Sequence, residues 1–163
     1  MPDPRAPVFE RLHSLRIPYE LHEHPPVFTA EEAARHWQTL DGVAVKNLFL
    51  RNKKGDRHYL VMLGIDRQAD LRQLVRIVGD DRLSFGSPER LMQYLGVEPG
   101  SVSPFGLIHD HGRGVQVIVD ADLREAARLI LHPNDNTASV TISGPDFVRF
   151  LEAQGNTVRW VRL

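Results

Sequence analysis

The chain has 163 residues, 42% of them hydrophobic and 25% charged, and it carries a formal net charge of −1 at pH 7. This length and composition fit one globular domain over residues 1–163, and the balanced charge excludes a general nucleic-acid coat protein while allowing a basic patch that contacts a few phosphates. The absence of cysteine excludes disulfides, thiolate nucleophiles and cysteine-rich zinc sites, and it is compatible with a reducing cytosol.

The N-terminal half alternates between helical and strand-like patterns. Its start, MPDPRAPVFE, lacks the apolar stretch of a signal peptide, and no segment reaches membrane-spanning length. We therefore expect a flexible stretch over residues 1–6 and a soluble, cytoplasmic protein with no membrane partner. The predicted elements are a helix over 8–15, a strand after Pro18, a helix capped by Thr29, a strand over 43–51, a turn over 52–56, a strand over 58–64 and a helix opened by Asp70.

The C-terminal half adds helices that start at Ser87 and Ser143. The predicted elements are a helix from Pro88 to the stop at Gly96, a loop over 96–110, a strand over 114–120, a short helix over 121–129, two strands around the loop 132–137, a helix over 144–155 and a strand over 157–163. Hairpins with interspersed helices predict an α/β (α+β) protein, with a mixed sheet or partly closed barrel and helices packed outside it.

Lys46 is the most informative residue of the chain. It is one of three lysines against seventeen arginines, and it interrupts the apolar run VAVKNLFLR. Side chains alternate across a strand, so Lys46 should share a face with Ala44, Leu48 and Leu50, where burying an unpaired charge is costly. We interpret Lys46 either as a ligand-binding cation or as a lysine that reaches from a barrel end into solvent. Asn47 should point the opposite way on a regular strand.

The loop Gly100–Pro104, GSVSP, is a second candidate site element. Glycine and proline favour a sharp turn whose backbone amides can point at a carbonyl or a developing oxyanion. An ordinary connection is the alternative, because most turns of this composition are structural. Neither Ser101 nor Ser103 has the flanking glycines of a nucleophile elbow, so the sequence does not predict a serine hydrolase.

The loop over residues 132–137, HPNDNT, concentrates hydrogen-bonding groups between two apolar strands. Such a loop can recognise a ribose or an amine, or it can be a turn in which Asn and Asp bond their own backbone. His132 is a candidate base or water-holding group, and a structural histidine is the alternative. Two pairs of alternating histidines lack a third ligand at metal-site spacing, so no metal site is predicted. These pairs are His22 with His24 and His109 with His111.

Four segments, in this order and spacing, resemble a known family. They are HPPVFT from His24, VKNLFLR from Val45, DRLSFGSPERLMQYLGVEPGSVSPFGLIHD from Asp81 and HPNDNTASV from His132. The family is that of the freestanding editing proteins related to the prolyl-tRNA synthetase editing domain, the YbaK-type superfamily. The chain is most similar to the alanyl-tRNA(Pro) deacylase branch, ProX or PrdX.

The resemblance implies hydrolysis of the ester between a wrong amino acid and its tRNA, without a metal or organic cofactor. The family's motif lysine corresponds to Lys46, and its glycine-to-proline loop to Gly100–Pro104. Because the ester is already activated, water needs positioning and oxyanion stabilisation more than a covalent nucleophile. We expect Lys46 to hold the terminal adenosine's phosphate or polarise the ester, and amides near Gly100 and Ser101 to orient the carbonyl or ammonium group. Further candidate substrate contacts are Asn47, Val102, Ser103, Pro104, His132, Asn136 and Thr137.

The expected partner is the acceptor end of tRNA(Pro), with a transient contact to prolyl-tRNA synthetase and no DNA binding. A small apolar pocket would exclude proline by size while accepting alanine. The rival hypothesis is a non-catalytic module that holds tRNA ends or a synthetase, because fold does not dictate activity. Candidates for tRNA contact, each with a solvated surface charge as the alternative, are Arg72, Arg76, Arg82 and Arg90.

Overall fold

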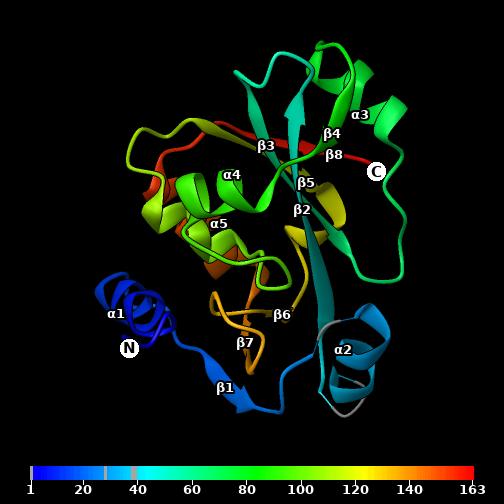
Figure 1. Cartoon of the computed structure of the whole chain (residues 1–163). Helices are drawn as coiled ribbons and strands as arrows, with labels where there is room; N and C mark the ends of the chain where they lie inside the picture. Colours follow the sequence, from blue (N-terminus) through cyan, green and yellow to red (C-terminus); the bar gives the residue numbers. More distant parts are fainter. Residues whose placement is uncertain (1, 28, 38–39) are drawn as a thin grey trace.

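The computed structural model describes residues 2–27, 29–37 and 40–163 (Figure 1). The helices of this part are α1 (Ala6–Ser14), α2 (Ala30–Trp37), α3 (Leu71–Val78), α4 (Pro88–Leu95) and α5 (Gly144–Gln154), and short 3-10 helices are η1 (Pro104–His109) and η2 (Ala121–Leu123). The strands are β1 (Glu20–Glu23), β2 (Val43–Asn52), β3 (His58–Gly64), β4 (Leu83–Phe85), β5 (Val115–Asp120), β6 (Leu129–Leu131), β7 (Ala138–Ile142) and β8 (Val158–Val161).

Local capping signals set the ends of the helices much as we expected. The hydroxyls of Ser87 and Ser143 accept backbone amides at the starts of α4 and α5, and Gly96 and Gly155 end the same helices in the left-handed conformation. Thr29 accepts the amide of Glu32 at 3.1 Å in the first turn of α2. These predictions are confirmed because a cap involves residues only a few positions apart.

The predicted helix over 121–129 is wrong. Only η2 forms there, and residues 124–128 lead to β6 without forming a helix. The carbonyl of Ala126 accepts the amide of Gly144 at 2.8 Å instead of continuing a helix. A Cβ on Gly144 would lie 2.6 Å from the carbonyl oxygens of Ala126 and Arg124, so this close approach needs glycine. Strand β4 and helix η1 were not predicted either.

All the strands belong to one mixed sheet, as predicted. Its order is β1-β7-β6-β2-β3-β5-β8, with β4 pairing with β2 beside this path, and the sheet remains open. Strand β2 links the two halves, because Val43 and Ala44 pair in parallel with β6 whereas residues 45–51 pair in antiparallel with β3. The β6 ladder stops at Ala44, so the two strands diverge just before Lys46.

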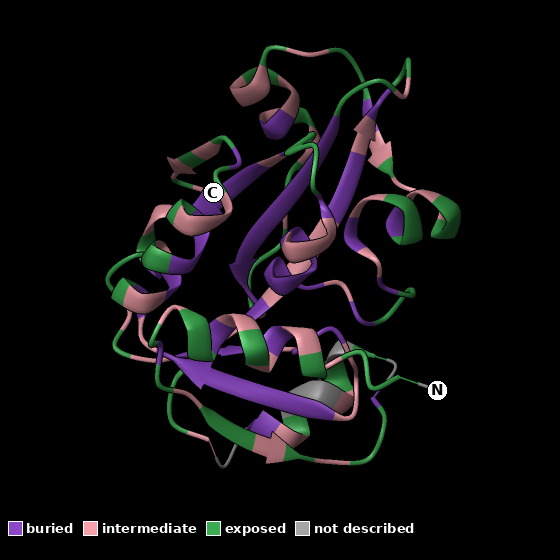
Figure 2. Cartoon of the chain, turned by 90° about the vertical axis from the view of Figure 1, so that its left-hand side faces the viewer, coloured by how far each residue is buried: buried purple, intermediate pink, exposed green. Residues whose placement is uncertain are grey.

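Helices cover both faces of the sheet, and the two faces bury separate clusters. Val45 and Phe49 of β2 belong to the larger cluster, which lies under α1, α4 and α5. Leu50 belongs to a second cluster with Leu74 of α3, and Leu48 packs against it. Figure 2 shows the central strands buried between helices whose outer faces are exposed, and every residue of β3 is buried. Among the described residues, no helix is both long and apolar enough to cross a bilayer.

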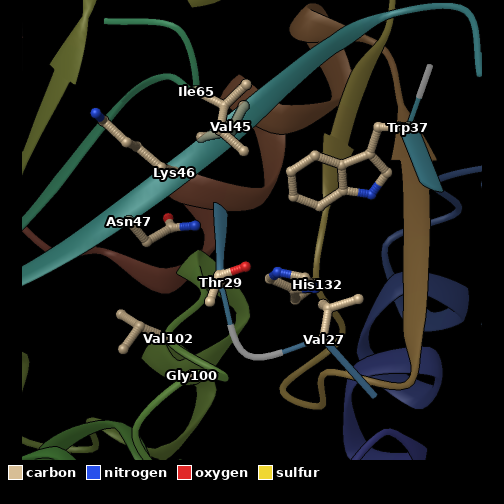
Figure 3. Close-up of a pocket in the computed structure, with 10 residues that line it drawn as sticks. All are labelled: Val27, Thr29, Trp37, Val45, Lys46, Asn47, Ile65, Gly100, Val102 and His132. Carbon is tan, nitrogen blue, oxygen red and sulfur yellow. The ribbon is translucent and has the colours of Figure 1, made fainter. Parts of the chain in front are cut away.

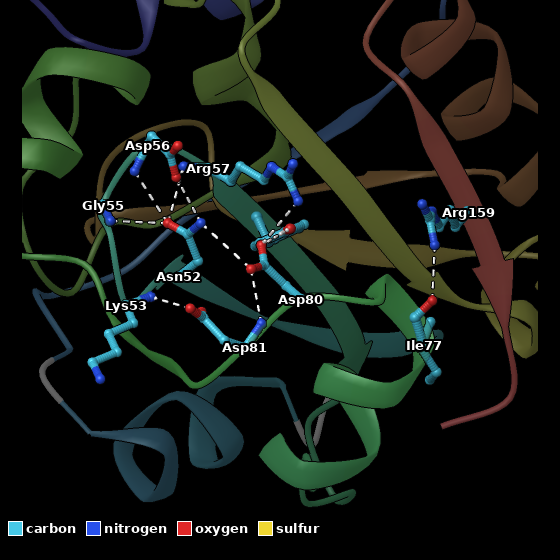
Figure 4. A network of polar contacts seen from close by, with 10 residues as sticks. Asn52, Lys53, Gly55, Asp56, Arg57, Ile77, Asp80, Asp81 and Arg159 are labelled. Atoms are coloured by element: carbon cyan, nitrogen blue, oxygen red, sulfur yellow. Dashed lines mark hydrogen bonds and ion pairs between the residues drawn. The ribbon is translucent and has the colours of Figure 1, made fainter.

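A polar network ties the β2–β3 turn to the segment after α3 (Figure 4). The side-chain oxygen of Asn52 accepts the amides of Gly55, Asp56 and Arg57, so a single residue organises the predicted turn. The hydroxyl of Tyr59 donates to Asp80 at 2.6 Å. The backbone amide of Lys53 donates to Asp81 at 3.1 Å. The carboxylates that follow α3 are therefore engaged with the hairpin.

Candidate active site

A cavity of about 230 Å³ opens where β2 and β6 diverge (Figure 3). Its walls combine four aliphatic side chains and a tryptophan with a small number of polar groups, an arrangement typical of small-ligand sites. The lining comes from the segment before α2, the end of α2, β2, the residue after β3, the α4–η1 loop and the residue after β6. The lining residues are Val27, Thr29, Trp37, Val45, Lys46, Asn47, Ile65, Gly100, Val102 and His132.

Lys46 and Asn47 both line this cavity but extend in different directions. Figure 3 shows the Lys46 side chain pointing away from Gly100 and His132, whereas Asn47 turns toward Thr29. Lys46 is only half-buried, and its ammonium makes no hydrogen bond or ion pair within the described part of the chain. This is the geometry of a lysine that reaches from the edge of a site toward solvent. Such a cation suits a phosphate at the cavity mouth better than an ester deep inside.

Asn47 shares its face with Val45 and Phe49, which are buried in the larger core. Its side-chain oxygen is buried and has no hydrogen-bond partner among the described residues. An unsatisfied buried acceptor costs roughly 1–3 kcal/mol, so a donor from a ligand or water would stabilise it. The alternation along β2, which we expected, thus turns an amide rather than the lysine ammonium toward the centre of the cavity.

The α4–η1 loop contributes backbone donors, but not the pair that the sequence indicated. The amide of Ser101 donates to the carbonyl of Glu98 at 3.0 Å, so it is already occupied, and Ser101 does not line the cavity. The amides of Gly100 and Val102 donate no hydrogen bond within the described ranges. Gly100 has a φ of +89°, a conformation that favours glycine. The amides available to a ligand are therefore those of the two residues that flank Ser101.

Ser103 joins the two polar loops that flank the cavity. Its buried hydroxyl donates to the carbonyl of His132 at 2.6 Å and accepts the amide of Phe105 at 3.0 Å, which caps η1. Pro104 is buried at the first position of η1. Both residues hold the loop in place, and neither lines the cavity.

His132 is the cavity residue whose protonation the surroundings perturb. Burial lowers the pKa of its imidazole below 6.5, so the ring is neutral at pH 7. Its Nδ1 lies 3.4 Å from the carbonyl of Ala138, which assigns the proton to Nδ1 and leaves Nε2 as an acceptor. Within residues 2–27, 29–37 and 40–163, no three acidic, histidine or cysteine side chains gather closely enough to hold a metal.

Asn136 and Thr137 act on the chain segment before α2 instead of lining the cavity. The side-chain amide of Asn136 donates to the carbonyl of Val27 at 3.0 Å, and its own carbonyl accepts the Val27 amide at 3.3 Å. The carbonyl of Thr137 accepts the amide of His24 at 2.9 Å. These contacts position the segment that brings Val27 and Thr29 to the cavity.

A second anchor holds the end of α2. The indole nitrogen of Trp37 donates to the buried hydroxyl of Ser139 at 2.7 Å. The same hydroxyl lies 3.1 Å from Nε2 of His24, whose Nδ1 lies 2.9 Å from the carbonyl of Pro25. His24 therefore carries its proton on Nδ1 and accepts from Ser139. Trp37 also packs against His132 with ring centroids 5.4 Å apart.

The four arginines proposed for tRNA contact fall into two groups. Arg72, Arg76 and Arg82 line one groove between α3 and β4. Arg90 points elsewhere, because its guanidinium donates to the carbonyl of Gly55 at 2.9 Å and to the imidazole of His58 at 2.8 Å. Arg90 is thus occupied inside the fold.

Sequence reasoning missed half of the cavity wall. Thr29 was identified only as a helix cap, and of the five apolar lining residues only Val102 was named. The other four could not be found from periodicity, because they come from separate elements that only the sheet topology brings together. These residues are Val27, Trp37, Val45 and Ile65.

Comparison with known proteins decides the family. The sequence profile of the aminoacyl-tRNA editing domain matches residues 24–150, which include the whole cavity lining. The chain belongs to the aminoacyl-tRNA editing domain family. The resemblance inferred from the motifs is thereby confirmed, and so is the expected fold class.

Individual proteins match this chain over nearly its whole length. The chain is 41% identical to the prolyl-tRNA editing protein ProX of Acetoanaerobium sticklandii, over 99% of this chain and 98% of that protein. It is 36% identical to the prolyl-tRNA synthetase associated domain-containing protein 1 of Mus musculus, over 93% of this chain and 92% of that protein. A crystal structure of a proposed trans-editing enzyme for prolyl-tRNA synthetase has the same fold, with a TM-score of 0.73 and 23% identity. The match covers 100% of this chain and 99% of that chain.

Proposed function

We propose that this chain is a trans-editing deacylase that hydrolyses the ester of mischarged tRNA, with alanyl-tRNA(Pro) as its substrate. The observation that carries the proposal is the Asn47 side chain in the wall of a small apolar cavity of the editing family, because its buried oxygen has no hydrogen-bond partner among the described residues. A free aminoacyl ammonium is a donor that this acceptor lacks. The names of the ProX relative and of the trans-editing structure support the same activity.

The cavity supports a preference for a small amino acid. Its volume of about 230 Å³ is confined by aliphatic side chains and by the Trp37 ring. A rigid wall excludes a larger side chain by overlap, although it gains little affinity from a single methyl group. In this proposal Val45 and Ile65 are the part of the wall that the ring of proline meets and the methyl group of alanine does not.

The proposed reaction needs no covalent intermediate. Water adds to the ester carbonyl carbon, the bond from that carbon to the ribose oxygen breaks, and the ribose hydroxyl leaves with a proton. The free amides of Gly100 and Val102 would stabilise the oxyanion. The neutral imidazole of His132 would hold the water through its Nε2 acceptor. Lys46 would grip a phosphate of the terminal adenosine at the cavity mouth.

The setting of the reaction follows from its substrate. An aminoacyl-tRNA substrate implies a cytoplasmic location, contact with the acceptor end of tRNA(Pro) and a transient encounter with prolyl-tRNA synthetase. We further propose that residues 1–163 act as one editing domain. No DNA contact is part of this proposal.

The decisive experiment follows deacylation of a panel of aminoacylated tRNAs by the parent chain and by Lys46→Ala. Loss of the phosphate contact should lower kcat/KM for alanyl-tRNA(Pro) by roughly tenfold to a hundredfold. Lys54→Ala is the matched control, because Lys54 is exposed on the β2–β3 turn. A chelator should leave the parent rate unchanged. Equal rates for Lys46→Ala and the parent would remove Lys46 from the mechanism, and tRNA binding without hydrolysis of any panel member would establish the binding-module alternative.

A further inference from the structure

A groove of about 630 Å³ lies between α3 and β4, outside the cavity described above. Its floor is apolar and its rim carries three arginines. The residues that line it are Leu71, Arg72, Val75, Arg76, Arg82 and Leu83. Arg72 and Arg76 are four positions apart on α3, so their side chains emerge on the same side of the helix.

The three guanidinium groups of the rim are unpaired in the part of the chain that the structure describes. Within the described residues, Arg72, Arg76 and Arg82 form no side-chain hydrogen bond, ion pair or ring contact. Of the carboxylates nearest in sequence, Asp70 caps α3 by accepting the backbone amides of Arg72 and Gln73. Asp80 and Asp81 are engaged by the β2–β3 hairpin (Figure 4). Among the other arginines of the described residues, five pair with carboxylates, namely Arg5, Arg57, Arg67, Arg128 and Arg149. The groove is therefore a local excess of positive charge on a chain whose net charge is −1.

The groove lies on the face of the sheet from which Lys46 extends. Leu48 and Leu50 alternate with Asn47, so they share the Lys46 face, and Leu50 packs with Leu83 in the cluster under α3. Leu50 also pairs with Phe85, the last residue of β4. Lys46 and Leu50 are four positions apart on β2, which corresponds to about 13 Å at ~3.3 Å per residue.

Phe85 adds an exposed aromatic ring to this face. Its exposed fraction is 62%, the largest among the exposed large hydrophobic residues of the described chain. It lies two positions after Leu83 on the same strand, so the ring emerges on the side of the groove. Exposed aromatic rings beside a line of cations are how single-stranded nucleic acid is bound without sequence readout, because bases stack on the ring while cations meet the phosphates.

We propose that the α3–β4 groove docks the acceptor arm of the tRNA substrate, with Arg72, Arg76 and Arg82 contacting backbone phosphates and Phe85 stacking on an unpaired base of the 3′ end. The proposal rests on the deacylase function. A separation of about 13 Å corresponds to roughly four stacked nucleotides at ~3.4 Å each, which is the scale of the unpaired end of a tRNA. With the terminal adenosine at Lys46, the first phosphates of the acceptor stem reach the arginines.

Charge favours this occupant over a protein partner. An apolar floor alone would fit either, but a protein would have to bring several carboxylates to satisfy the three cations, whereas a polynucleotide presents a phosphate at every residue. Each arginine–phosphate contact releases counterions, so binding through this groove must weaken as salt rises, with a slope of about −0.7 per contact on single strands and about −0.9 on duplex.

The test compares Arg72→Gln/Arg76→Gln with the parent in two assays. In the first, fluorescence anisotropy measures the affinity for full-length, unacylated tRNA(Pro) across a salt series. The double variant should bind roughly tenfold more weakly at low salt and should lose about 1.4 to 1.8 from the slope of log K against log salt. Arg16→Gln is the matched control, because Arg16 is exposed and follows α1, which lies across the molecule from α3 in Figure 1.

The second assay separates docking from chemistry. The double variant should show a raised KM and an unchanged kcat on alanyl-tRNA(Pro), and it should hydrolyse a short alanylated CCA trinucleotide at the parent rate. Phe85→Ser should weaken binding of intact tRNA but not of tRNA that lacks its unpaired 3′ nucleotides.

The outcomes distinguish the two proposals. If the double variant has the tRNA affinity and salt slope of the parent, the proposal that the groove docks tRNA is wrong, and the deacylase function remains intact. If the parent hydrolyses no substrate, the function fails, and the anisotropy series still decides whether the groove binds tRNA. A parent that binds no tRNA would overturn both.

Discussion

Ser139 makes the sharpest prediction about how the cavity wall is held. Its hydroxyl is fully buried, accepts the indole N–H of Trp37 at 2.7 Å and donates to Nε2 of His24 at 3.1 Å. One oxygen thus fastens the end of α2 to β7 and to the segment before α2. Ser139→Ala removes both hydrogen bonds and leaves the Trp37 N–H buried without an acceptor.

The expected loss follows from these two contacts. An orphaned buried donor costs roughly 1–3 kcal/mol, and the hydrogen bond to His24 contributes about 1 kcal/mol more. We therefore expect Ser139→Ala to lower the free energy of unfolding by about 3 kcal/mol. For a chain of this length, that corresponds to a decrease of roughly 6–12 °C in Tm. Urea and thermal unfolding followed by circular dichroism measure both quantities.

Thr141→Val is a matched control on the same strand. Thr141 lies two positions on, so it is on the same face of β7, and its buried hydroxyl has no hydrogen-bond partner among the described residues. Replacing that hydroxyl by a methyl group of similar size should be neutral or slightly stabilising. A loss below about 0.5 kcal/mol for Ser139→Ala, or equal losses for the two variants, would refute the anchor.

Two further predictions concern pH and substrate size. Burial lowers the pKa of His58, His109 and His132 below 6.5, so the unfolded chain binds more protons than the native chain near that pH. The free energy of unfolding should hence be highest above about pH 6.5 and fall toward pH 5, and identical urea midpoints at pH 7.5 and pH 5 would contradict this. Ile65→Ala should enlarge the cavity and raise kcat/KM for prolyl-tRNA(Pro) relative to alanyl-tRNA(Pro) by roughly tenfold or more, whereas Ile77→Ala, outside the cavity, should not. An unchanged ratio in Ile65→Ala would rule out that residue as a size filter.

Much of the fold and part of the site were accessible from the sequence because their signals are local. The caps at Ser87 and Ser143, the turn at Asn52 and the alternation of Lys46 with Asn47 depend on residues within a few positions of one another. The family motifs likewise lie in short runs. These features required no knowledge of which strands are neighbours.

Long-range pairing decided which of the candidate residues meet. Only the tertiary structure shows that β6 stops pairing with β2 at Ala44, which opens the cavity and brings His132 opposite Asn47. The Ser101 amide is occupied by a hydrogen bond to the carbonyl of Glu98, and the Arg90 guanidinium is occupied by a hydrogen bond to His58.

For this chain, the sequence alone determined most of the helices and strands, the fold class and the family, because caps, turns and alternating faces arise from neighbours along the backbone. The tertiary structure alone decided that Asn47 faces the cavity while Lys46 reaches to its edge, and that Arg72, Arg76 and Arg82 share a groove. The physical reason is that strand register and helix docking are set by burial of apolar surface between segments distant in sequence, and no local pattern encodes where those segments will meet.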